Sequence, residues 1–187
     1  MVKKNACIFI SGKGTNLSNL IKKSRDYNFP INIRLVVTNN KEAKGIIHAK
    51  KNSIPYIVIN TNSRYFENQI ITNLNIHNIS FICLAGYMKI ISKNFLRSFK
   101  KNIINIHPSL LPKFKGLNTY KKILIKKEKK TGCTVHFVNE QLDSGQIITQ
   151  KSFFIENNDN EETLKDKTQQ LERFAFPEAI IKIYKYS

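Results

Sequence analysis

The sequence predicts an α/β protein with a mostly parallel, twisted sheet, helices on both faces and an antiparallel strand pair near the C-terminal part. Three observations lead to this fold class. Short apolar runs alternate with helix-like stretches from residue 7 to residue 108, which is typical of parallel βαβ units. The run ISFICLAGY (79–87) is almost continuously apolar, as expected of a strand buried on both faces. After residue 131, two strand-like segments flank the acidic turn EQLDSG, which favours an antiparallel pair.

The elements of the first part follow from the spacing of apolar residues and from the turn residues between them. Ser63 is a suitable N-cap for one of the helices. A proline ends the last strand of this part. The predicted strands are residues 7–11, 31–39, 54–60, 79–87 and 102–108, and the predicted helices are residues 16–23, 42–52, 64–77 and 92–100.

The part from residue 131 onward has a different order. TGCTVHFVN (131–139) and QIITQKSFFI (146–155) predict the two late strands, and a final helix is expected over about 161–185. Glu161 and Glu162 suit the partial positive charge at the start of that helix. No internal repeat or long linker divides the 187 residues, so a single domain over 1–187 is expected.

The formal charge of +18 raises the hypothesis of nucleic-acid binding. Only five of the 31 basic residues are arginines, however, whereas surfaces that read bases or phosphates favour arginine. The lysines are spread along the whole chain, and Asn and Ile are similarly frequent. We interpret the charge as compositional bias, with modest attraction of anionic substrates as a by-product. Nucleic acid is therefore not an expected partner.

Cysteine usage and hydropathy indicate a reducing, aqueous compartment. Cys7, Cys83 and Cys133 are odd in number and scattered, without CxxC or Cys/His spacing, so neither a disulfide framework nor a metal site is predicted. The apolar stretch at the N-terminus is too short for a signal peptide, and no segment approaches the roughly 20 apolar residues of a membrane span. We expect a cytoplasmic protein with no membrane contact.

A glycine loop, SGKGTN (11–16), follows the first strand and opens a helix. Backbone N–H groups at such a helix start bind phosphate well. Leu17 occupies the third glycine position of a dinucleotide fingerprint, and the Walker spacing is missing, so neither of those motifs is present. The loop predicts a phosphate-monoester site, and a tight strand-to-helix turn without any ligand is the alternative.

Asn105 and His107 lie two residues apart in NIHPSLLP (105–112), so in a strand their side chains share one face. An amide donor beside an imidazole suits a reaction in which a carbonyl oxygen becomes an oxyanion and protons move. Asp143 lies in the turn QLDSG, and a carboxylate facing His107 would orient the ring and favour its protonated form. Spacing alone does not bring Asp143 to His107.

Ordinary structural roles are the alternative for each of these residues. A strand-end histidine before proline is often hydrogen-bonded for structure alone, and LDSG is a common turn composition. His48 and His77 lie in expected helices without acidic or nucleophilic neighbours and are left out of the site. His136 alternates within TVHFV and could face the core or the site, and we assign it a supporting position behind the catalytic residues.

Several motifs together make the chain similar to the phosphoribosylglycinamide formyltransferase family, the folate-dependent enzymes of purine synthesis. The likeness covers nearly the whole chain, and the order and spacing of the last two motifs are specific. The motifs are ISGKGTNLSNLI (10–21), VVTNNKEAKGIIHAKKNSIP (36–55), LAGYMKIIS (84–92), NIHPSLLPKFKGLNTYKK (105–122) and GCTVHFVNEQLDSGQII (132–148).

The resemblance implies a Rossmann-like fold and direct transfer of a formyl group from the co-substrate 10-formyltetrahydrofolate to the amine of glycinamide ribonucleotide. It implies a tetrahedral intermediate, with no covalent enzyme intermediate and no metal. By the resemblance, the catalytic residues are Asn105, His107 and Asp143. The residues that would hold the substrate's phosphate and glycinamide are Gly14, Thr15, Asn16, Leu17, Ser18 and Glu172. The residues that would contact folate are Arg64, Met88, Lys89, Ile90, Ile91, Asn139, Glu140, Gln141 and Leu142.

Some positions depart from the family pattern. Lys13 replaces a small polar residue, Lys89 a frequent arginine, and Asn118 and Arg173 stand where histidine is common. The chain also ends before the family's C-terminal extension, which leaves affinity and stability open. None of these departures touches the catalytic trio.

Three rival functions remain from the sequence. Methionyl-tRNA formyltransferase shares the SLLP segment, but it needs a further tRNA-binding domain. Formyltetrahydrofolate deformylase resembles LPKFKGLNTY, but it carries a regulatory domain and a histidine where Pro108 stands. An RNA-binding protein would need clustered arginines or aromatic platforms, which are not visible. The glycine loop favours the glycinamide substrate, so we expect small-molecule partners and a monomer or homodimer.

Overall fold

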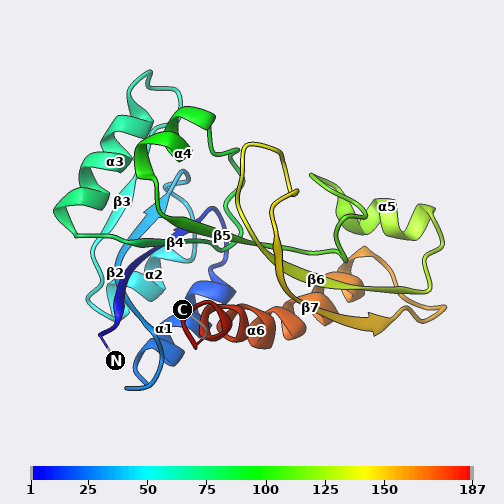
Figure 1. Cartoon of the computed structure of the whole chain (residues 1–187). Coiled ribbons are helices and arrows are strands. Elements are labelled where there is room, and N and C mark those ends of the chain that lie inside the picture. The colour runs from blue at the N-terminus through cyan, green and yellow to red at the C-terminus, as the bar shows by residue number, and fades with distance from the viewer. Residues whose placement is uncertain (1, 186–187) are drawn as a thin grey trace. The chain divides into compact units, whose positions relative to one another are not determined.

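The structure is a computed structural model and describes residues 2–185, with side chains described as far as residue 184. The chain divides between Ile104 and Asn105 into two compact units. Unit 1 contains four complete strands and four helices, and unit 2 contains two complete strands and two helices (Figure 1). Strand β5 (Asn102–His107) runs across the boundary between the units.

Unit 1 is a parallel βαβ arrangement with the strand order β3-β2-β1-β4. The pairs β1–β2, β1–β4 and β2–β3 are all parallel. The strands are β1 (Lys4–Ile10), β2 (Ile31–Thr38), β3 (Tyr56–Val58) and β4 (Phe81–Leu84). The helices are α1 (Thr15–Ser24), α2 (Ile46–Lys51), α3 (Phe66–Ile76) and α4 (Lys93–Phe99).

The core of unit 1 is built around β1, which lies between β2 and β4. Residues 6–10 of β1 and all four residues of β4 are buried, as expected of strands covered on both faces. Leu17, Leu20 and Ile21 form the buried side of α1. The ring of Phe9 meets Tyr87 and Phe95 edge to face. The predicted buried strand at 79–87 is therefore confirmed at its centre.

Two helix starts in unit 1 differ from the sequence prediction. Helix α3 begins at Phe66, and the hydroxyl of Ser63 accepts the N–H of Tyr65 instead of capping the helix, so the predicted N-cap is wrong. Helix α2 begins at Ile46 because the side chain of Asn40 accepts the N–H of Glu42 and holds the preceding residues in turns.

Unit 2 contains the predicted antiparallel pair, β6 (Lys130–Phe137) and β7 (Ile147–Phe154). Their register runs from Lys130 opposite Phe154 to His136 opposite Ile147, with an irregularity before His136. Helix α6 (Glu161–Lys185) packs against both strands (Figure 1). Its buried residues include Leu164, Ala175, Phe176, Ala179 and Ile180.

The sequence prediction omitted one helix of unit 2, α5 (Thr119–Ile125). The helix has only seven residues, and Asn118 before it has a left-handed φ of 58° and makes no side-chain cap. Neither a long periodic pattern nor a capping signal was available to indicate it. The predicted α/β class, with parallel strands followed by an antiparallel pair, is confirmed. Among the described helices, none has the length and apolarity that crossing a bilayer requires.

Candidate active site

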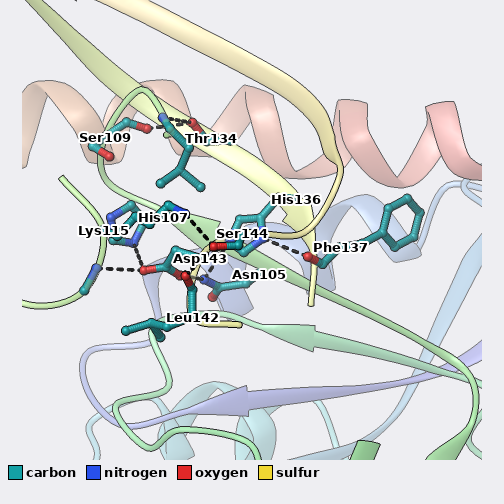
Figure 2. A network of polar contacts seen from close by, with 12 residues as sticks. Asn105, His107, Ser109, Lys115, Thr134, His136, Phe137, Leu142, Asp143 and Ser144 are labelled. Atoms are coloured by element: carbon teal, nitrogen blue, oxygen red, sulfur yellow. Dashed lines mark hydrogen bonds and ion pairs between the residues drawn. The ribbon is translucent and has the colours of Figure 1, made fainter. Parts of the chain in front are cut away.

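The end of β5 and the turn between β6 and β7 bring three predicted catalytic side chains together within unit 2 (Figure 2). Asn105 and His107 alternate with the buried Ile106 along β5, so both project from one face of the strand. Asp143 has a φ of 46°, the left-handed region that aspartate tolerates better than most residues. This conformation lies in the turn that carries the carboxylate to His107.

The two carboxylate oxygens of Asp143 have different partners. Oδ2 lies 3.3 Å from Nδ1 of His107 and accepts the backbone N–H of Gly116 at 2.8 Å. Oδ1 accepts from the amide nitrogen of Asn105 at 3.4 Å. His107 and Asp143 are both buried, at 5% and 8% exposure. The carboxylate is therefore oriented from two sides and largely withdrawn from water.

Hydrogen bonding holds the Asp143 carboxylate in its charged form. Burial alone would raise its pKa, but its polar contacts with the His136 ring, with the Gly116 N–H and with His107 lower the pKa to about 2. At neutral pH the group is an anion. It can therefore stabilise positive charge on a neighbouring imidazole.

The pKa of His107 is lowered, chiefly because the ring is buried. The carbonyl of Phe114, 2.8 Å from Nε2, and the charge of Asp143 both act to raise the pKa, but they do not outweigh burial. The charge of Asp143 thus acts on the pKa of His107 in the predicted direction. The net effect of the surroundings nevertheless lowers this pKa and favours the neutral imidazole. Each ring nitrogen faces an acceptor, so only the protonated ring could satisfy both.

His136 lies against the trio, consistent with the supporting position predicted for it. Its Nε2 is 3.2 Å from the amide nitrogen of Asn105 and 3.6 Å from Oδ1 of Asp143. Its Nδ1 is 2.8 Å from the carbonyl oxygen of Phe137, and the side chain is 2% exposed. The ring is therefore wedged between its own strand and the catalytic candidates.

Backbone contacts around the trio could not be read from the sequence. Thr134 donates its hydroxyl to the carbonyl of Ser109 and accepts the N–H of Leu111, which fixes the chain just after His107. Lys115 donates to the hydroxyl of Ser144, the residue next to Asp143 (Figure 2). The partners Phe114 and Gly116 act through main-chain atoms, so their side chains gave no signal. Only the glycine in FKGL, with its φ of 75°, hinted at a special turn.

The predicted phosphate loop lies in unit 1, between β1 and α1. Gly14 precedes α1 with a φ of 73°, and no side chain caps the helix start. A Cβ on Gly14 would stand 2.6 Å from the Cα of Gly45, so this glycine is required by close packing as well as by φ. Leu17 is fully buried, so only its backbone could meet a ligand, whereas Thr15 and Ser18 are partly exposed.

The remaining predicted residues lie in both units. In unit 1, Arg64 is exposed before α3, and Met88, Lys89 and Ile90 are exposed in the segment after β4, with Ile91 partly buried. Ser11 of the glycine loop accepts the N–H of Met88, which ties that segment to the loop. In unit 2, Glu172 is buried on α6. Exposed residues of the turn before Asp143 are Asn139, Glu140, Gln141 and Leu142.

The arrangement of the trio can support attack on a carbonyl group. An amide donor, a neutral imidazole and an anionic carboxylate together can stabilise an oxyanion and move a proton. Within residues 2–185, no cluster of three or more His, Cys, Asp or Glu side chains is suited to hold a metal ion.

Known proteins resemble this chain over most of its length. Residues 4–180 match the family described as formyl transferase. The trifunctional purine biosynthetic protein adenosine-3 of Drosophila pseudoobscura pseudoobscura is 40% identical over 184 residues, which are 95% of this chain and 14% of that protein. The chain thus spans about one seventh of this curated relative.

Several relatives of similar size are named phosphoribosylglycinamide formyltransferase. The phosphoribosylglycinamide formyltransferase of Haemophilus influenzae is 37% identical over 93% of this chain and 84% of its own. The crystal structure of the phosphoribosylglycinamide formyltransferase from Bacillus halodurans matches with a TM-score of 0.93 and 34% identity, over 98% of this chain and 97% of that one. The predicted recognition and the predicted enzyme class are confirmed by these matches. The chain belongs to the phosphoribosylglycinamide formyltransferase family.

Proposed function

We propose that this protein transfers the formyl group of 10-formyltetrahydrofolate to the primary amine of glycinamide ribonucleotide, a step of purine synthesis. The observation that carries the proposal is the contact of Asp143 with both His107 and Asn105, in a chain of this family. The relatives named phosphoribosylglycinamide formyltransferase support this choice of acceptor.

In the proposed mechanism, the amine nitrogen of the acceptor attacks the formyl carbon and gives a tetrahedral intermediate. The Asn105 amide donates to the oxygen that becomes negative. Nε2 of neutral His107, oriented by the contact of Nδ1 with Asp143, gives up its contact with the Phe114 carbonyl and accepts a proton from the attacking amine. The bond from the formyl carbon to N10 of the folate then breaks, and N10 leaves with the proton that His107 returns, which restores the neutral ring. No covalent bond to the protein and no metal take part.

The binding roles implied by the family are also part of the proposal. The segment Gly14 to Ser18 would hold the ribose phosphate on the N–H groups at the start of α1, with Glu172 at the glycinamide amine. Arg64, residues 88–91 and residues 139–142 would contact the folate. The exposure of most of these residues leaves them accessible to a ligand.

We treat both units as one functional domain, because the family match from residue 4 to residue 180 runs across their boundary. The expected partners are the two small-molecule substrates, and the expected compartment is the cytoplasm. The expected oligomeric state is a monomer or a homodimer.

The direct test is formyl transfer from 10-formyltetrahydrofolate to glycinamide ribonucleotide, followed by the absorbance of the folate product. Formyl transfer that depends on the nucleotide is expected. Release of formate without the acceptor would instead indicate a deformylase, and formylation of methionyl-tRNA would indicate the tRNA enzyme. Tight RNA binding at physiological salt without any folate turnover would contradict the enzyme proposal.

A charge substitution tests the phosphate loop separately. Thr15→Glu places an anion at the first residue of α1. We expect it to weaken the binding of glycinamide ribonucleotide by about 10-fold or more, because the anion repels the phosphate. Folate affinity should stay unchanged, and Thr15→Gln serves as the uncharged control. Calorimetric titration with each ligand measures both affinities. An equal loss of both affinities would show that the phosphate does not bind at this loop.

A further inference from the structure

We propose that His136 is a positioning residue, which holds the Asn105 amide so that its nitrogen, not its oxygen, is presented to the reacting formyl group. This inference rests on the proposed function for its chemistry and on the described contacts for its geometry. His136 lies on β6, Asn105 lies on β5, and both belong to unit 2 (Figure 2).

The hydrogen-bond partner of Nδ1 defines the proton position on His136. The carbonyl oxygen of Phe137 can only accept, and it lies 2.8 Å from Nδ1, so Nδ1 must carry the hydrogen. In the neutral ring, Nε2 then has a free lone pair. Because the side chain is 2% exposed, water has little access to that lone pair, and a protein donor must satisfy it.

The donor is the amide nitrogen of Asn105, at 3.2 Å from Nε2. An amide nitrogen only donates, so one of its two N–H groups points at His136. Turning the amide by 180° would place the carbonyl oxygen of Asn105 against the lone pair of Nε2 and against Oδ1 of Asp143. Both contacts would be repulsive, so the neutral His136 ring selects a single amide orientation.

The second N–H of Asn105 is held more loosely. Its acceptor, Oδ1 of Asp143, is 3.4 Å away, longer than the typical separation of about 2.9–3.0 Å. This N–H is thus the one that can move to a developing oxyanion, while His136 keeps the amide in place. If Nε2 of His136 were protonated, it would donate to Asp143, which lies 3.6 Å away, and would lose its bond from Asn105.

Two near-isosteric variants test the roles of the two ring nitrogens of His136 one at a time. The side-chain amide of His136→Gln reaches the position of Nε2 and can accept from Asn105, whereas that of His136→Asn reaches only the position of Nδ1 and the Phe137 carbonyl. We expect kcat to fall about 10-fold in His136→Asn, less than the 100- to 1,000-fold for deleting an oxyanion donor. In His136→Gln, kcat should stay within about threefold, and KM should change little in both variants.

A double mutant tests whether the effect passes through Asn105. In an Asn105→Ala background, His136→Asn should cause no further loss of kcat, because the amide that it positions is gone. An equal kcat in the Asn and Gln variants, or a full additional loss in the Asn105→Ala background, would overturn the proposal. Unfolding midpoints of all variants show whether each protein is folded during the assay.

A spectroscopic measurement tests the geometry without turnover. Nitrogen-15 NMR of the histidine rings should find His136 with a protonated Nδ1 and a bare Nε2 at neutral pH. A protonated Nε2 would overturn the positioning role. If the parent protein transfers no formyl group although His136 has this tautomer, the proposed function fails while the contact with Asn105 stands.

Discussion

At the residue scale, the carboxylate of Asp143 connects the groups of the candidate site. One oxygen faces His107 and the Gly116 N–H, and the other faces Asn105 and His136. Its pKa of about 2 keeps it ionised throughout the neutral range. The charge is therefore available to stabilise an imidazolium that forms during the reaction.

Substituting Asp143 with asparagine keeps the size of the side chain and removes the charge. We expect Asp143→Asn to lower kcat about 100-fold, within the range typical of lost acid–base assistance, with a much smaller effect on both KM values. The reason is that the charge acts on His107 mainly during the reaction. Steady-state kinetics with both substrates give these values. Asp166→Asn, on the exposed side of α6, is the matched control, and equal turnover in parent and Asp143→Asn would refute the role.

The pH dependence of activity tests the state of His107. Because burial lowers its pKa below the ordinary value of 6.5, the acidic limb of the kcat/KM profile should lie below pH 6.5. The charge of Lys122 also lowers this pKa. Lys122→Gln should therefore raise the pKa of His107 and move the acidic limb to higher pH. The exposed neighbour Lys121→Gln is the control, and a limb that moves to lower pH in Lys122→Gln would contradict the assignment.

At the element scale, the loop between β1 and α1 shows how a ligand-binding prediction and a packing requirement can share residues. Gly14 is left-handed and lies against Gly45, which donates its backbone N–H to the carbonyl of Gly12 at 2.9 Å. Gly12 itself has nothing within 4 Å of an added Cβ. The glycine pattern is therefore explained at Gly14 by the fold alone, and not at Gly12.

Alanine substitutions separate these two glycines. Gly14→Ala should lower the free energy of unfolding by more than about 1–2 kcal/mol, the cost of a left-handed non-glycine residue, because the clash with Gly45 adds to it. Gly12→Ala should stay within about 0.5 kcal/mol of the parent. Urea unfolding measures both. Equal stabilities for the two variants would show that the packing at Gly14 is not as described.

At the scale of the whole molecule, the sequence predicted the elements that long apolar patterns specify. Strand β1 and the helix from Glu161 were predicted near their observed bounds. The apolar run at 79–87 identified the buried centre of β4, because burial on both faces leaves an unbroken apolar run, but it extends beyond both ends of that strand. The short helix α5 was not predicted, and the predicted start of α3 was wrong. Their ends are decided by single side-chain hydrogen bonds and by left-handed residues such as Asn118.

For the candidate site too, part could be predicted from the sequence and part could not. The shared face of Asn105 and His107 followed from strand periodicity. Asp143 was assigned by resemblance, since 35 residues of chain lie between it and His107 and only the folded turn brings them to 3.3 Å. The lowered pKa of His107 could not be foreseen, because burial is a property of the packed unit.

The excess of lysine is also a property of the whole molecule. Lys113 pairs with Glu128, Lys151 and Lys182 pair with Glu178, and Lys167 pairs with Asp159, so several lysines in unit 2 are used in ordinary ion pairs. Each pair has at least one side chain that is partly exposed, and ion pairs near the surface contribute little to stability. They agree with the view that the charge of +18 reflects composition more than a binding surface.

Formyl transfer is expected to depend on the amide of Asn105, and the single-turnover rate of Asn105→Ala measures this dependence. With both substrates saturating, the rate should fall about 100- to 1,000-fold, which corresponds to about 3–4 kcal/mol of transition-state stabilisation. Asn102→Ala, at the exposed start of the same strand, should retain the parent rate. An Asn105→Ala rate within about threefold of the parent, a loss far below that typical of an oxyanion donor, would contradict the account.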